Sequence, residues 1–159
     1  MRLTREELEG AAFGVTSGVI TTLAVLIGVN LATGSRLATI AAILTVAVAD
    51  AFSDAAGIYT AKEAGRMSEA KIWSVTFTSF FAKFIFSLIF VIPLLILRAI
   101  TAVAVSIIGA FAILFLLGAF VAARRGKSPL QSAVEHSLIG MGVAFLSYIL
   151  GQLLANLRQ

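Results

Sequence analysis

The chain has 159 residues, of which 60% are hydrophobic and only 13% are charged, and its formal net charge is +4. An ordinary soluble domain is about 25% charged, so this chain has about half of the charge that a water-facing surface needs. The composition therefore excludes a soluble globular protein, and the lack of cysteine excludes disulfides, thiolate metal sites and a catalytic thiol.

Five apolar stretches fill the chain and predict an all-α polytopic membrane protein with one transmembrane domain over residues 1–159. Each stretch is long enough for a spanning helix, which needs about 20 mostly apolar residues. The five predicted spans cover residues 12–34, 37–60, 72–97, 99–122 and 133–157. The acidic start of the chain does not resemble a cleavable signal peptide, so we expect the first span to be retained.

Helix ends and one interruption are also visible in the sequence. Thr4 opens a T-x-x-E capping box, which predicts a short amphipathic lead over residues 4–11. Ser128 followed by Pro129 is typical of a helix start. Pro93 lies inside the third span and should kink it.

Basic residues in the short loops predict the orientation, because cytoplasmic loops carry the excess of Lys and Arg. The side of the N-terminus has Arg2, Arg5, Lys62, Arg66, Lys71, Arg124, Arg125 and Lys127, and the other side has Arg36, Arg98 and Arg158. We therefore expect a multi-pass protein of the cell membrane with its N-terminus in the cytoplasm and its C-terminus outside. Because the basic residues lie at span ends, membrane topology explains them. We therefore expect the lipid bilayer, and no nucleic acid, as a partner.

Three ionisable side chains lie inside the predicted spans: Asp50, Asp54 and Lys83. A charge at the bilayer centre costs at least about 2.5–3.5 kcal/mol, so these residues are functional candidates. The two Asp residues are one helical turn apart on one face and offer up to four oxygens to a divalent cation. We interpret them as metal ligands and proton acceptors, with Lys83 tuning the local charge. The alternative is a purely structural ion pair between Asp50 and Lys83, which would leave Asp54 unpaired.

Hydroxyl side chains lie near the same depth and are candidates for secondary oxygens along a path. These are Ser17, Thr21 and Thr22 on the first span and Ser53 on the second. For the first three, hydrogen bonds back to the helix backbone are an equally good explanation.

Small residues recur at four-residue spacing on the first two spans. Gly14 and Gly18 form a G-x-x-x-G motif, and Ala49, Ser53 and Gly57 repeat beside the two Asp residues. Such spacing allows close helix approach, so we expect the first and second helices to pack tightly.

Three stretches resemble the vacuolar iron transporter family, and the resemblance runs over nearly the whole chain. They are GVTSGVITTLAVLIGV, ADAFSDAAGIYTAKEAG and RRGKSPLQSAVEHSLIGMGVAFLSYILGQLL. The resemblance implies a homodimer whose first and second helices line a path for Fe²⁺ or Mn²⁺. It also implies export of these metals from the cytoplasm in exchange for protons, with the metal as substrate and no cofactor.

Departures from the family pattern fall on the chemistry. Ser17 stands where the family has Asp, Asp54 where it has Met, and Ile58 where it has Glu. The long acidic cytoplasmic insert is absent, as in a divergent, short, prokaryotic-type member. Replacing a thioether by a carboxylate shifts the expected preference toward harder ions such as Mn²⁺.

Two other classes of protein are alternatives. An enzyme is disfavoured: the D-x-x-x-D motif resembles that of CDP-alcohol phosphotransferases, but the chain has no further Asp for a second metal cluster. An intramembrane aspartyl protease needs Asp residues on two helices. A non-transporting scaffold or regulatory protein, which kept the fold and lost the metal site, stays open because of Ser17 and Lys83.

Overall fold

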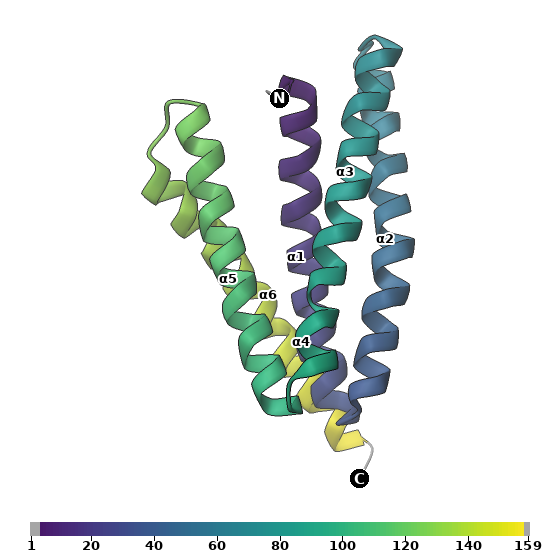
Figure 1. Ribbon diagram of the computed structural model, residues 1–159, viewed down its shortest axis with the longest axis vertical. Coiled ribbons are helices and arrows are strands. Elements are labelled where there is room, and N and C mark those ends of the chain that lie inside the picture. Colours follow the sequence, from purple (N-terminus) through teal and green to yellow (C-terminus); the bar gives the residue numbers. More distant parts are fainter. Residues whose placement is uncertain (1–3, 158–159) are drawn as a thin grey trace.

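The computed structural model describes residues 4–157, and these residues form six α-helices (Figure 1). The helices are α1 (Arg5–Thr33), α2 (Arg36–Ala64), α3 (Glu69–Ile89), α4 (Val91–Ile96), α5 (Ala99–Arg124) and α6 (Pro129–Leu157). Five segments are long and apolar enough to cross a membrane, and α3 with α4 forms one of them. The prediction of an all-α protein with five membrane spans is confirmed.

The helix starts follow the local sequence. At Thr4 the side chain accepts a hydrogen bond from the backbone of Glu7, and the Glu7 carboxylate accepts one from the backbone of Thr4. This is the predicted capping box. The lead over residues 4–11 is not a separate helix, however, because no helix breaker follows it and α1 runs unbroken from Arg5 to Thr33.

The third span is interrupted where Pro93 disturbs it. Pro93 has no backbone N–H and its ring collides with the carbonyl four residues earlier, that of Ile89. Accordingly α3 ends at Ile89 and the short α4 begins at Val91. The predicted kink is thus a break between two helices.

Helix α1 lies in the middle of the bundle, with α2 and α3 on one side and α5 and α6 on the other (Figure 1). The helices converge at the end of the bundle that holds the C-terminus. At the opposite end, α5 and α6 diverge from α1, α2 and α3. The start of α1 therefore lies between two groups of helices that are apart at this end.

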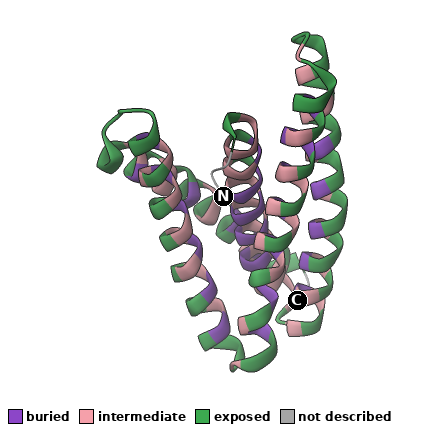
Figure 2. Cartoon of the chain, turned by 45° about the horizontal axis from the view of Figure 1, so that its top comes forward, coloured by how far each residue is buried: buried purple, intermediate pink, exposed green. Residues whose placement is uncertain are grey.

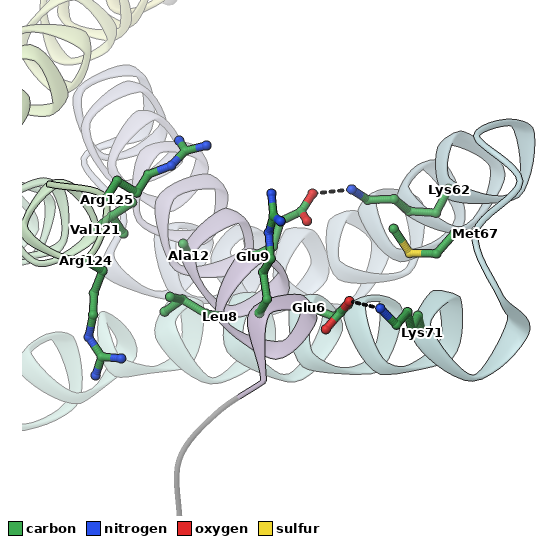
Figure 3. Close-up of a pocket in the computed structure, with 11 residues that line it drawn as sticks. Glu6, Leu8, Glu9, Ala12, Lys62, Met67, Lys71, Val121, Arg124 and Arg125 are labelled. Carbon is green, nitrogen blue, oxygen red and sulfur yellow. Dashed lines mark hydrogen bonds and ion pairs between the residues drawn. The ribbon is translucent and has the colours of Figure 1, made fainter. Parts of the chain in front are cut away.

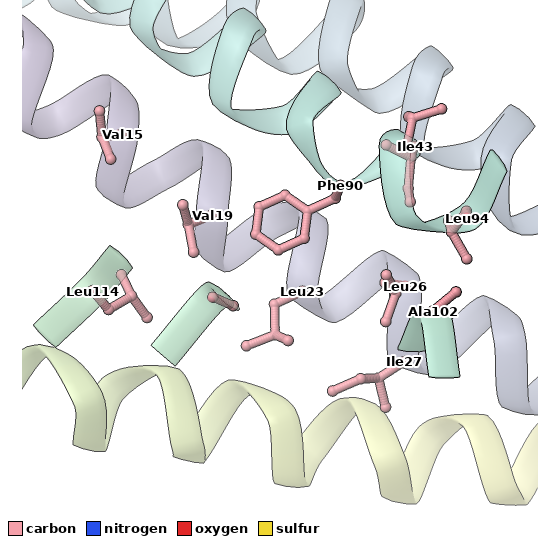
Figure 4. Packing of buried hydrophobic residues seen from close by; sticks show 12 residues of the cluster. Val15, Val19, Leu23, Leu26, Ile27, Ile43, Phe90, Leu94, Ala102 and Leu114 are labelled. Atoms are coloured by element: carbon pink, nitrogen blue, oxygen red, sulfur yellow. The ribbon is translucent and has the colours of Figure 1, made fainter. Parts of the chain in front are cut away.

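Apolar side chains fill the region where the helices converge (Figure 4). Leu23 and Leu26 of α1 are completely buried there, beside Leu94 of α4 and Leu114 of α5. Large apolar side chains also cover much of the outer surface, where buried residues are few (Figure 2). This outward face suits lipid, and close van der Waals packing has to hold the helices together.

Glycines bring α1 against α3, which corrects the expectation that the G-x-x-x-G motif joins the first two helices. A Cβ atom at Gly18 would lie 2.9 Å from the backbone oxygen of Lys83, and one at Gly14 would lie 2.9 Å from the Ala82 Cβ. The α2 residues Ser53 and Gly57 are exposed, and no neighbour lies within 4 Å of a Cβ built at Gly57. The spacing had identified a close-packing face, but its partner is α3.

An aromatic groove of about 570 Å³ runs along the outer face of α2 and α3. Trp73 stacks on Phe77 at a ring-centroid distance of 5.2 Å, and Tyr59 of α2 lies 5.2 Å from Trp73. Further along, Phe52 and Phe80 meet edge to face at 4.8 Å. These rings join the outer edges of α2 and α3.

Candidate functional site

Lys83 is the largest fully buried side chain among the described residues, with 1% of its surface exposed. Its ammonium Nζ lies 2.6 Å from Oδ2 of Asp50 and 2.5 Å from Oδ2 of Asp54. It also donates a hydrogen bond of 2.8 Å to the Ser17 hydroxyl. Three helices therefore meet at one buried cation.

Ser17 completes this cluster from α1. Its hydroxyl donates a hydrogen bond of 2.7 Å to Oδ2 of Asp54 while it accepts the one from Lys83. Because Gly14 and Gly18 let α3 approach this part of α1, the short Ser17 side chain reaches both partners. We call Ser17, Asp50, Asp54 and Lys83 the charge cluster.

The structure corrects the expectation that Asp54 would be left unpaired beside an Asp50–Lys83 pair. Asp50 and Asp54 are one turn apart, so both project toward α3. The ammonium on its four-carbon stem lies between them and contacts both carboxylates. The predicted ion pair is thus part of a larger cluster with a net charge of −1 when all three groups are ionised.

The two carboxylates are less enclosed than the lysine. The side chains of Asp50 and Asp54 are 30% and 20% exposed, respectively. The contact of Asp50 Oδ2 with Lys83 is an ion pair without hydrogen-bond alignment, and this buried oxygen has no other partner within residues 4–157. The cluster therefore holds carboxylate oxygens that can accept a further ligand.

Of the other predicted hydroxyls, none is hydrogen-bonded to the charge cluster in the described part of the chain. Thr22 is buried on α1 with 2% exposure, Thr21 is half-buried, and Ser53 is exposed on α2. Ser17 is thus the one predicted secondary oxygen that directly contacts the carboxylates and Lys83.

Sequence reasoning missed a row of buried hydroxyl residues on α3. Thr76, Ser79 and Ser87 are each at most 6% exposed and share a face with Lys83. The hydroxyls of Thr76 and Ser79 have no hydrogen-bond partner among residues 4–157. Their spacing of three or four residues from each other and from Lys83 is the signal that would have identified them.

The described residues contain no group of three or more His, Cys, Asp or Glu side chains that could hold a metal ion. A single chain therefore offers two carboxylates and hydroxyl oxygens. These hard oxygen donors are of the type that Mn²⁺ and Mg²⁺ prefer. With Lys83 in contact with both carboxylates, an incoming cation has to compete with the ammonium for them.

Comparison with known proteins identifies one family. The sequence model of the VIT family matches residues 62–152, which is more than half of the chain. The match includes Lys83 and all of α5, whereas Ser17, Asp50 and Asp54 lie outside it. No curated protein matches the chain.

Proposed function

Since the chain belongs to the VIT family of membrane metal-ion transporters, we propose that it exports a divalent cation, Fe²⁺ or Mn²⁺, from the cytoplasm by proton antiport. The observation that carries this proposal is the charge cluster, in which Asp50 and Asp54 surround one cation inside the membrane spans. Ionisable side chains inside membrane spans are expensive and mark ion pathways. The basic residues beside the N-terminus support the direction, because they favour its placement in the cytoplasm.

In this mechanism the Lys83 ammonium is a resident cation that the metal replaces. The two carboxylates together carry −2 when ionised and balance one divalent cation. Adding that cation while the ammonium stays would leave a net +1 in a medium of low dielectric constant, which is unfavourable. Asp50 and Asp54 therefore bind either the metal or Lys83, and protons on the carboxylates balance the charge on the return step.

A route to the cluster is supported by the hydroxyl row of α3. Thr76 and Ser79 precede Lys83 by about two turns and one turn, and their hydroxyls have no partner within residues 4–157. Together with Ser17 they offer oxygens that replace water around a cation entering from the end of the bundle that holds the N-terminus. In this proposal Thr21, Thr22 and Ser53 line the path further along.

The carboxylates are partly exposed in one chain, and we propose that a homodimer encloses them. Small exposed residues of α2, Ser53 and Gly57 among them, lie beside the carboxylates and permit close approach of a second chain. Two copies would bring four carboxylates and two lysines together, with a net charge of −2 when all are ionised.

The test is uptake of Fe²⁺, Mn²⁺, Co²⁺ and Mg²⁺ into proteoliposomes, with and without a proton gradient. The null variant is the triple substitution D50N, D54N and K83M, because it removes the carboxylates without leaving Lys83 buried and unpaired. The matched control is E63Q with E69Q, which removes two exposed carboxylates outside the charge cluster.

We expect uptake by the wild type and by the control, and none by the folded triple variant. Transport by the triple variant would place the pathway elsewhere. Uptake that is independent of the proton gradient would remove the antiport from the proposal. With K83M alone we expect tighter metal binding, because the competing ammonium is gone.

The second candidate function is a non-transporting scaffold or regulator. It is favoured by the same contacts, because a lysine between two carboxylates satisfies them without a metal. In that case the wild type takes up no ion, and its thermal stability does not change with added metal. A metal-binding native state is instead stabilised as ligand is added, so a melting experiment separates the two functions.

A further inference from the structure

A second polar region lies outside the charge cluster, at the end of the bundle where α5 and α6 diverge. It is a cavity of about 1080 Å³ beside the N-terminal part of α1 (Figure 3). Basic side chains dominate its charged lining, namely Arg5, Lys62, Lys71, Arg124 and Arg125. The cavity also has apolar lining from Leu8, Ala12 and Val121.

The two lysines are neutralised on one side of the cavity. Lys71 forms an ion pair of 2.7 Å with Glu6, and Lys62 forms one with Glu9. The first pair joins the start of α1 to the start of α3, and the second joins it to the end of α2 (Figure 3). Both acidic residues of the lining, Glu6 and Glu9, are therefore paired with lysines.

The arginines have no such partner. Arg5, Arg124 and Arg125 form no ion pair with a carboxylate anywhere between residues 4 and 157. Arg124 lies over the ring of Phe120, 5.0 Å from its centroid, which leaves the in-plane N–H donors of its guanidinium free. Arg124 and Arg125 lie on the α5 side, opposite the two ion pairs (Figure 3).

We propose that this cavity binds the headgroup of an anionic phospholipid, with Arg5, Arg124 and Arg125 supplying the positive charge of its lining. Guanidinium groups match phosphate oxygens in charge and in bidentate geometry. Basic pockets between membrane helices are known to hold anionic headgroups. Leu8 and Val121 provide the apolar contact that a lipid makes and a free phosphate does not.

The charge of the cavity is opposite in sign to that of the charge cluster. With both glutamates paired to lysines, three positive charges remain on its lining. Such a lining attracts an anion. The site therefore has a ligand of opposite sign to the proposed transport substrate.

The experiment measures lipid binding to the whole chain in detergent by native mass spectrometry. The probes are dioleoylphosphatidylglycerol, dioleoylphosphatidylcholine and inorganic phosphate. The test variant is R124Q with R125Q, and the matched control is R66Q with K127Q, which removes two exposed basic residues that do not line the cavity. A third variant, R124K with R125K, keeps the charge and shows whether guanidinium geometry matters.

We expect the wild type to bind one phosphatidylglycerol in preference to phosphatidylcholine. The R124Q and R125Q pair should weaken that binding about 25-fold, from about fivefold for each arginine, and the control pair should change it little. Equal losses in both pairs, or equal binding of the two lipids, would overturn the proposal. Displacement of phosphatidylglycerol by millimolar inorganic phosphate would assign the site to a free anion and overturn the lipid as its ligand.

Discussion

The two sides of α1 are built differently. Toward α2 and α3, α1 presents glycines and Ser17, and the contact encloses a lysine with two carboxylates. Toward α5 and α6 it presents Leu23 and Ile27 to an apolar cluster with no buried charge in the described residues. One helix thus serves both as a wall of the polar site and as part of the apolar core.

The different sides should respond differently to the same kind of substitution. The first side depends on charge balance and on the short distance between α1 and α3. The second depends on the volume of its apolar side chains, so it tolerates conservative substitutions better than the first side does. The loss of stability is measured by unfolding in mixed micelles and, for the open face of α2, in a bilayer.

The largest effect is expected for D50N with D54N. These changes leave the Lys83 ammonium buried without a counter-charge, which destabilises a protein by about 3–5 kcal/mol. Adding K83M should restore most of the loss. If the double variant were as stable as the wild type, the charge cluster would not hold α2 and α3 together.

A smaller effect is expected for Gly14→Ala, at about 1–3 kcal/mol of lost stability, because overpacking forces backbone shifts. The new Cβ would lie 2.9 Å from the backbone nitrogen of Lys83. Gly142→Ala on α6 is the control, since nothing lies within 4 Å of its Cβ, and it should not destabilise the protein. Equal losses at the two positions would show that the close approach of α3 to Gly14 is unimportant for stability.

Ser17→Ala should lower stability by about 1–2 kcal/mol, because the hydroxyl bridges Lys83 and Asp54 and its hydrogen bonds involve charged groups. Ser137→Ala on α6 is matched to it, since the Ser137 hydroxyl donates only to the backbone oxygen of Ala133. We expect this control to change stability by less than about 0.5 kcal/mol. A loss at Ser137 as large as that at Ser17 would show that the bridge is unimportant.

The smallest effect is expected for Gly57→Ala on the open face of α2. Alanine favours the helix by up to about 1 kcal/mol over glycine, and no neighbour obstructs the added methyl group. A clear loss of stability in a bilayer would instead mean that a second chain covers this face, as the proposed homodimer requires.

The sequence allowed the spans and the ionisable residues inside them to be predicted, because length and hydropathy are properties of each segment alone. The prediction that Gly14 and Gly18 pack against the second helix was wrong for a physical reason. Helical spacing tells which residues share a face, but the opposing helix depends on how all helices pack.

The charge cluster was predictable in part for a related reason. An ion pair between Asp50 and Lys83 was foreseen as one alternative, but the bridge to Asp54 depends on the reach of the lysine stem and on the approach of α3 to α1. The divergence of α5 and α6 had no signal in the sequence, since hydropathy shows that each helix can span a membrane but not how the two are placed.

The aromatic groove has a practical consequence. Trp73 is the single tryptophan of the chain, it is 46% exposed, and its ring contacts Tyr59 of the neighbouring helix. Its fluorescence therefore reports on the contact between α2 and α3, the helices that supply Asp50, Asp54 and Lys83. Separation of these two helices would change the emission, so the chain has an intrinsic fluorescent probe that needs no added dye.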